Sequence, residues 1–121
     1  MAGNINSDGY DIEARKRFIN IDANDVKRVK RLRPVGEKKI DPILDQLYTH
    51  FQLFPETNAF LQSERHIANL KQAQGRFFMD LLSGEYGQEY LEKRLSVGRT
   101  HERIGLEPQW YIGSYSMYIN L

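Results

Sequence analysis

Hydrophobic residues recur every three or four positions along almost the whole chain, and this spacing restricts the fold more than any other feature. Such a spacing places hydrophobic side chains on one face of an α-helix, whereas a half-buried strand needs strict alternation. No alternating segment of useful length occurs, and the chain has neither an internal repeat nor a low-complexity stretch. The sequence therefore predicts an all-α fold.

Capping residues, glycines and prolines divide this pattern into separate helices. In chain order, the predicted helices cover about residues 9–18, 22–34, 37–51, 64–82, 88–103 and 107–121, and residues 57–61 are expected to form a short helix or a turn. Asp8 and Asp22 are expected to cap the first two helices. Pro34 is expected to end or kink the second helix, with Gly36 marking the break, because proline removes a backbone donor and clashes with the preceding turn. The aromatic last helix reaches Leu121 without a capping residue, so we expect the chain to be a fragment that is truncated there, or an unusually short version of a longer protein.

The composition excludes several classes of protein. A chain of 121 residues, of which 40% are hydrophobic, suits a single globular domain. The absence of cysteine rules out disulfides, thiolate metal sites and cysteine nucleophiles. The chain has no hydrophobic run long enough to cross a bilayer and no secretory signal at its start, so we expect a cytoplasmic protein with no membrane partner.

Basic residues gather in the first third of the chain. The cluster comprises Lys27, Arg28, Lys30, Arg31, Arg33, Lys38 and Lys39. No aromatic residue is interleaved with it, and no motif that reads nucleic acid surrounds it. We interpret the cluster as the solvated face of a helix and expect no nucleic-acid partner.

Three histidines are the main candidates for chemistry: His50, His66 and His101. They are not grouped as zinc ligands, and the chain has no glycine-rich phosphate loop, no nucleophile elbow and no plausible Ser/His/Asp set. A lone histidine most often has a structural role. His101 differs because it ends a helix just before the residues IGL and an aromatic helix that begins with proline. A histidine facing a hydrophobic pocket suits a large apolar cofactor, and haem is the first candidate.

Three segments resemble one known family. The stretch THERIGLEPQWYIGSY (Thr100–Tyr115) is similar to the proximal segment of the globin-coupled sensors, which are bacterial haem proteins of the globin superfamily. DQLYTHF (Asp45–Phe51) and LKQAQGRFFMDLLSGEYGQEYLEKR (Leu70–Arg94) resemble the distal helices of the same family. The resemblance implies a sensor-globin fold that is incomplete at its C-terminus. Residues 1–35 would form an N-terminal helical extension and the first globin helix, and residues 36–121 the haem-binding core.

The resemblance also implies roles for individual residues. His101 matches the proximal histidine that binds the haem iron, and Tyr48 matches the distal tyrosine whose hydroxyl donates to bound O₂ in many members. Tyr111 matches a residue that lies near the haem on the proximal side. The resemblance implies a haem of the b type. Further residues expected to contact it are Leu70, Ala73, Phe77 and Ile104. The position of Ala73 holds a ligand-binding threonine in some members, so this chain is expected to depend more on Tyr48.

Simpler explanations stay open for several of these residues. Tyr48 lies on a hydrophobic stripe and could be a core residue only. His66 lies on a similar helical face to Leu70, so it could be a sixth haem ligand or a residue at the pocket rim. The haem propionates could pair with Lys93, Arg94 or Arg99, and the sequence does not choose among them.

The family resemblance implies a haem-based sensor of O₂, or of another diatomic gas such as CO or NO, in a bacterial signal-transduction protein. Such a domain precedes an output signalling domain, so we expect no enzymatic activity from this chain itself. The family dimerises through its last two helices, and we expect a homodimer only in the full-length protein. Two alternatives stay open: a haem-free helical regulatory or interaction module, and a globin with redox or NO-detoxifying activity.

Overall fold

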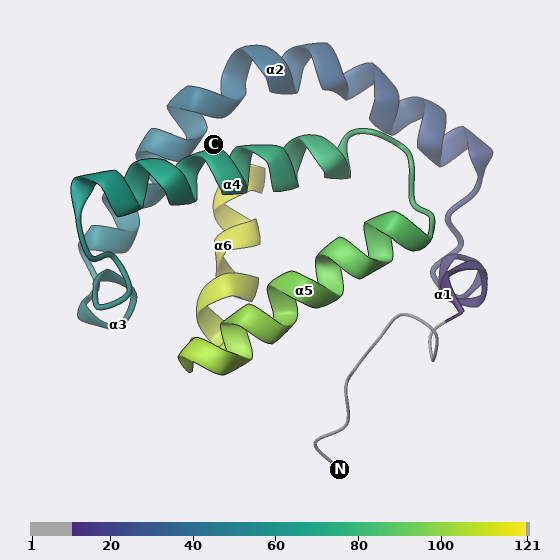
Figure 1. Cartoon of the computed structure of the whole chain (residues 1–121). Helices are drawn as coiled ribbons and strands as arrows, with labels where there is room; N and C mark the ends of the chain where they lie inside the picture. Colours follow the sequence, from purple (N-terminus) through teal and green to yellow (C-terminus); the bar gives the residue numbers. More distant parts are fainter. Residues whose placement is uncertain (1–10, 121) are drawn as a thin grey trace.

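The computed structural model describes residues 11–120, and all regular structure within that range is helical (Figure 1). The helices are α1 (Ile12–Phe18), α2 (Ala23–Gln52), α3 (Pro55–Asn58), α4 (Glu64–Leu81), α5 (Gln88–Ile104) and α6 (Pro108–Asn120). The prediction of an all-α fold is confirmed for this part of the chain. Asp11 caps α1 by accepting from the backbone of Ala14, whereas the expected cap, Asp8, lies outside the described residues.

Helix α2 is continuous over 30 residues, so the expected break at Pro34 and Gly36 is wrong. The helix therefore also passes without interruption through the expected boundary between residues 35 and 36. Pro34 and Pro42 lie inside it, and each leaves the carbonyl group four residues earlier without its helical donor. Both prolines are exposed, and those two carbonyls belong to exposed lysines, where water can replace the donor. Figure 1 shows the result, a single arched helix that passes over α4.

Gly36 is buried where α2 meets the end of α4. A Cβ atom placed on Gly36 would lie 2.5 Å from Leu82 Cδ1 and 3.5 Å from Phe78 Cε1. A Cβ atom on Gly75 of α4 would lie 3.4 Å from Leu44 Cδ1. The second distance is an ordinary contact, so the close approach depends on glycine at position 36. Gly36 therefore serves the packing of α2 on α4 and does not end a helix.

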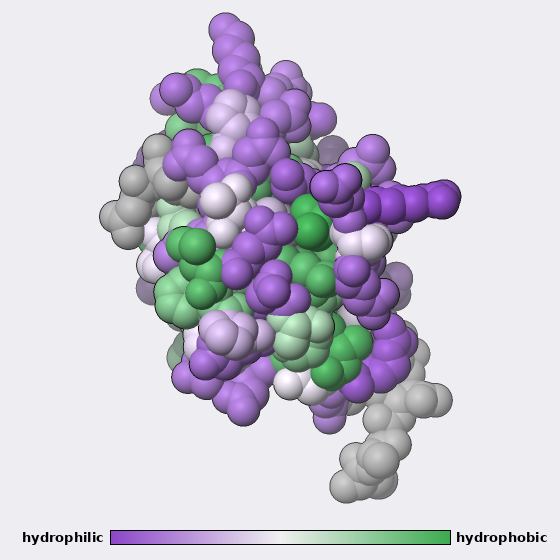
Figure 2. Space-filling model, turned by 90° about the vertical axis from the view of Figure 1, so that its left-hand side faces the viewer, coloured by the Kyte–Doolittle hydropathy of each residue, from purple (hydrophilic) through white to green (hydrophobic). Residues whose placement is uncertain are grey.

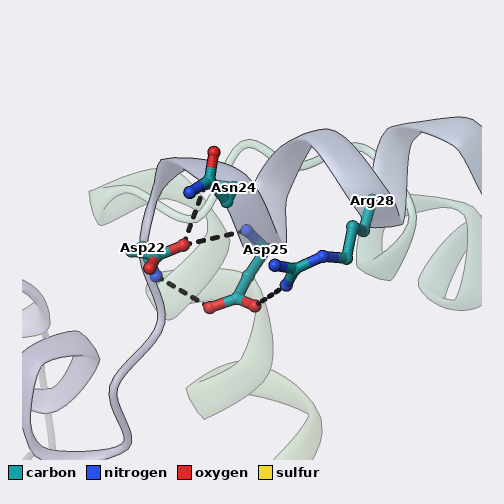
Figure 3. Close-up of polar contacts among 4 residues, drawn as sticks. All are labelled: Asp22, Asn24, Asp25 and Arg28. Carbon is teal, nitrogen blue, oxygen red and sulfur yellow. Dashed lines mark hydrogen bonds and ion pairs between the residues drawn. The ribbon is translucent and has the colours of Figure 1, made fainter.

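The start of α2 is fixed by a capping box (Figure 3). The Asp22 side chain accepts hydrogen bonds from the backbone N–H groups of Asn24 and Asp25, and the Asp25 side chain accepts from the backbone of Asp22. These bonds, led by the one from Asp25, hold the pKa of Asp22 below its usual value. Arg28 completes the group by donating to Asp25, and the helix thus begins where the sequence predicts.

The hydrophobic core is centred on the second half of α2. Its buried members there are Ile40, Leu44, Leu47 and Tyr48, of which Leu47 is fully inaccessible to solvent. The half-buried side chains that pack against them are Phe51, Leu61, Ile67, Leu70, Phe78, Met117 and Tyr118. Helix α4 lies between α2 and α5 in Figure 1, yet none of its own residues is fully buried. Its hydrophobic face therefore keeps part of its surface accessible.

The end of the molecule that carries α3 faces the viewer in Figure 2. Hydrophobic side chains appear there in separate groups between hydrophilic ones, and Leu53 and Phe54, just before α3, are exposed. This end is thus a mixed surface. Among the residues described, no helix has the length and hydrophobicity needed to span a membrane.

Candidate functional site

His101 lies in the last turn of α5, at a position fixed by the way this helix ends. Gly105 takes the left-handed conformation, with φ of 77°, and closes the helix. The N–H of Leu106 then donates to the His101 carbonyl over 3.0 Å, and the N–H of Gly105 donates to the Glu102 carbonyl over 3.1 Å. The chain reverses direction within a few residues, and α6 begins at Pro108.

The imidazole of His101 is half-buried and stacks on Tyr111, the residue that the resemblance places nearby. The two ring centroids are 4.4 Å apart and the ring planes differ by 20°. Burial lowers the pKa of His101, which favours the neutral ring. Among residues 11–119, no hydrogen-bond partner is found for either ring nitrogen, so a metal-binding nitrogen is available.

Tyr48 is buried in α2, with only 5% of its surface exposed. Its ring meets Phe51 edge-on at a centroid distance of 5.2 Å. Burial, with a smaller electrostatic effect from Tyr118, raises the pKa of Tyr48 to about 12, so the phenol stays protonated under ordinary conditions. Its hydroxyl has no hydrogen-bond partner within the described part of the chain. Tyr48 is therefore a neutral donor held in hydrophobic surroundings.

Helix α6 connects these two residues. Tyr111, near its start, stacks on His101, and Tyr118, near its end, packs against the core cluster that contains Tyr48. Residues seven positions apart lie on nearly the same face of a helix, separated by about 10 Å along its axis. His101 and Tyr48 thus lie near opposite ends of one face of α6.

Helices α4 and α5 are joined near one end and diverge toward the other (Figure 1). At the joined end, Arg94 donates to the Phe77 carbonyl over 2.9 Å, and its guanidinium lies 3.3 Å from the centroid of the Phe77 ring. Lys93 approaches Asp80 at 3.8 Å. His101 belongs to the diverging end. Two of the three expected propionate partners are thus engaged with α4, and the third, Arg99, is exposed.

The structure brings together some of the predicted lining residues and not others. Leu70 packs against the core cluster of Tyr48, and Phe77 is half-buried beneath Arg94. Ala73 is exposed, and Ile104 has 45% of its surface exposed, so neither of them contacts this core.

His66, the candidate sixth ligand, lies in the first turn of α4. Its Nδ1 accepts from the backbone N–H of Gln62 over 3.2 Å, and the backbone N–H of His66 donates to the capping hydroxyl of Ser63. This ring therefore helps to close the loop before α4. His50 lies in the last turn of α2 beside Phe54, at a ring distance of 5.0 Å.

The sequence did not identify one polar contact at the site, that between Gln74 and Tyr118. Gln74 Nε2 donates to the Tyr118 hydroxyl over 2.7 Å, although the two residues are 44 positions apart. Two signals were present: a polar residue within the hydrophobic stripe of α4, and a tyrosine seven residues after Tyr111. Neither signal predicts which residue the other will contact, because the contact joins two helices that are distant in the sequence, α4 and α6.

Two shallow cavities of about 450 and 430 Å³ lie along the outer side of this core. The first runs between α2 and α4 and is lined by residues that include Ile40, Lys71 and Met79. The second lies at the end of α2, between His50 and Met117. Neither of these two cavities is lined by His101 or Tyr48.

The chemistry of these two residues fits a haem. A neutral imidazole binds haem iron as an axial ligand, and a phenol can donate to a polar ligand of that iron. No group of three or more histidine, aspartate or glutamate side chains among the described residues could hold a metal ion. A single unbonded imidazole, stacked on Tyr111, suits a metal that a macrocycle already holds, and not a bare ion.

The order and packing of the helices define the class of protein. The fold is similar to the solved globin domain of the Geobacter sulfurreducens globin-coupled sensor, with a TM-score of 0.76 and 27% sequence identity. The match covers 88% of this chain and 68% of that chain. The fold is thus that of a globin, as the sequence predicts.

A sequence model of the Protoglobin family matches residues 8–120, and the chain belongs to this family. The chain is also 29% identical over 119 residues to the heme-based aerotactic transducer HemAT of Halobacterium salinarum. That match covers 98% of this chain and 24% of the relative, so the chain spans about a quarter of HemAT. The predicted resemblance to the globin-coupled sensors is confirmed.

Proposed function

We propose that this globin domain binds haem b through His101 and senses O₂ or another diatomic gas, which Tyr48 holds by a hydrogen bond. One observation carries the proposal. A half-buried imidazole and a buried phenol ring, both without a hydrogen-bond partner in the described chain, lie near opposite ends of one face of α6. A polar group that has no hydrogen-bond partner inside the folded chain is free to bind a ligand.

Haem, when bound, would supply a ferrous iron that binds O₂, CO or NO. His101 would bind the iron, and stacking on Tyr111 would limit rotation of its ring. Leu70 and Phe77 would exclude water, whereas Ala73 and Ile104, which are exposed, would lie at the rim of the proposed lining. Tyr48 would donate its hydroxyl hydrogen to the gas, and its raised pKa keeps that hydrogen in place across the physiological range.

A sensing role is supported by the relatives and by the position of α6. The relative HemAT is named a heme-based transducer, and this chain spans a quarter of it. We therefore propose that an output domain of a longer, cytoplasmic and dimeric protein reads the gas-bound state, and that this chain is not itself an enzyme. Helix α6 contacts both His101 and the core cluster of Tyr48. If α6 has two alternative packings, a gas that binds more tightly to one of them would shift the equilibrium toward that packing.

Titration of the purified haem-free chain with haemin tests the proposal. The unmodified chain is expected to develop an intense Soret band at a one-to-one ratio, and His101→Ala is expected to lose most of it. His50→Ala is the matched control, since it removes an imidazole from the end of α2 and should bind haem normally. Added imidazole should restore part of the band in His101→Ala. Equal haem spectra for all three proteins would overturn the proposed role of His101.

A further inference from the structure

A second polar pair lies against the core cluster that contains Tyr48. The side-chain amide of Gln74 donates to the hydroxyl oxygen of Tyr118 over 2.7 Å. The Tyr118 ring also stacks on Phe78, with centroids 5.2 Å apart and ring planes differing by 13°. A hydrogen bond and a ring stack together fix both the position of this phenol and the direction of its oxygen.

The hydroxyl of Tyr118 is prepared to donate. Its oxygen accepts from Gln74, while no acceptor for its own hydrogen is present among residues 11–119. Accepting one hydrogen bond polarises an O–H group and makes it a stronger donor. The Gln74 amide therefore both orients and activates a donor that the folded chain leaves unused.

This donor is close to Tyr48. Tyr118 packs against the buried cluster to which Tyr48 belongs, and a charge on Tyr118 would raise the pKa of Tyr48. Leu70 and Phe78, which belong to α4, pack against the same cluster. Two phenols, from α2 and α6, therefore meet in one hydrophobic region.

We propose that Tyr118, oriented by Gln74, is a second hydrogen-bond donor to the gas ligand beside Tyr48. This inference rests on the proposed function and extends it, because two donors would retain a polar gas more strongly than one. A polar gas such as O₂ would gain from the second donor, whereas the less polar CO would gain little.

The experiment compares O₂ release from haem-loaded proteins by stopped-flow spectroscopy. Tyr118→Phe keeps the ring that stacks on Phe78 and is expected to release O₂ about three- to tenfold faster, the loss of one ordinary hydrogen bond. Gln74→Met keeps the side-chain length and should give a smaller change in the same direction. Tyr115→Phe is the matched control, because it removes an exposed hydroxyl from the same helix and should leave the rate unchanged.

Two further measurements separate a ligand contact from a structural one. The C–O stretching band of bound CO should shift or change in shape in Tyr118→Phe and stay unchanged in Tyr115→Phe. Thermal unfolding of the haem-free proteins reports the structural contribution of the hydroxyl. A lower melting temperature for Tyr118→Phe, with the O₂ rate and the CO band both unchanged, would show that the hydroxyl only ties α6 to α4 and would overturn the inference.

Failure of the inference is distinguishable from failure of the proposed function. If Tyr48→Phe releases O₂ faster and Tyr118→Phe does not, the proposed function stands and the second donor is rejected. If the unmodified chain takes up no haem, both are rejected, and the missing Soret band identifies that case.

Discussion

Replacing Tyr48 by phenylalanine should separate ligand binding from stability. The hydroxyl has no partner within the described chain, so its removal deletes no internal hydrogen bond. We expect the free energy of unfolding of the haem-free Tyr48→Phe chain to stay within about 0.5 kcal/mol of the unmodified value, or to rise, because a poorly hydrated polar group is lost. Urea titration followed by circular dichroism measures this difference.

The same change should have a large effect on O₂. A hydrogen bond to an acceptor that carries charge contributes about 1.5–3 kcal/mol, which corresponds to about 10–100-fold in affinity. Tyr48→Phe should therefore weaken O₂ binding by about that factor, mainly by speeding release, and leave CO affinity nearly unchanged. Stopped-flow displacement of O₂ by CO gives the release rate, and CO titration gives the second affinity.

Tyr86→Phe is the control with the opposite outcome. The Tyr86 hydroxyl donates to the Leu81 carbonyl at the end of α4. Its removal should cost about 1 kcal/mol of stability and leave O₂ release unchanged. Equal effects of Tyr48→Phe on O₂ and CO would refute the reasoning, since the hydroxyl would not point at the ligand. A loss of stability as large as that of Tyr86→Phe would refute it too, because the hydroxyl would then have a structural partner.

Three further predictions concern stability, each measured by urea unfolding. The pKa of Tyr48 is raised from 10.0 to about 12 in the folded chain, so the unfolded chain releases this proton first as pH rises. Between those two pH values, the free energy of unfolding should fall by about 2–3 kcal/mol more in the unmodified chain than in Tyr48→Phe. Equal decreases would contradict the burial of this phenol. Gly36→Val should lower the stability by about 1–3 kcal/mol, because the new side chain meets the buried Leu82. Gly98→Ala has open space around it and should raise the stability by at most about 1 kcal/mol. Similar effects of the two substitutions would reject the close approach of α2 and α4. Arg94→Lys should cost about 1–2 kcal/mol by losing the planar contact with α4, and a neutral result would show that the contact does not hold α5 in place.

Local signals predicted most of the helix boundaries. Ser63 caps α4 and Gly105 ends α5, and both act within a few residues of their position. The continuity of α2 was not predictable in this way. Proline carries a local penalty at position 34, but exposure to water and the crossing with α4 at Gly36 offset it, and both depend on the folded chain.

The candidate site was likewise predictable in part: the sequence selected two of its residues but not the contacts between helices that surround them. His101 and Tyr48 were selected from the sequence because a resemblance supplied their roles, which short-range patterns alone leave open. The contacts that organise their surroundings are between helices: Gln74 reaches a residue 44 positions away, and Arg94 reaches one 17 positions away. Periodicity shows which face of a helix is hydrophobic, but it does not show which helix will cover that face.

The absorption spectrum of the reduced, haem-loaded chain, recorded without gas and then under O₂, tests the central claim most directly. We expect a five-coordinate ferrous spectrum without gas, because His101 is the single axial ligand proposed, and a reversible change to a six-coordinate spectrum under O₂. A spectrum that is six-coordinate without gas, or that is unchanged by O₂, would contradict the account.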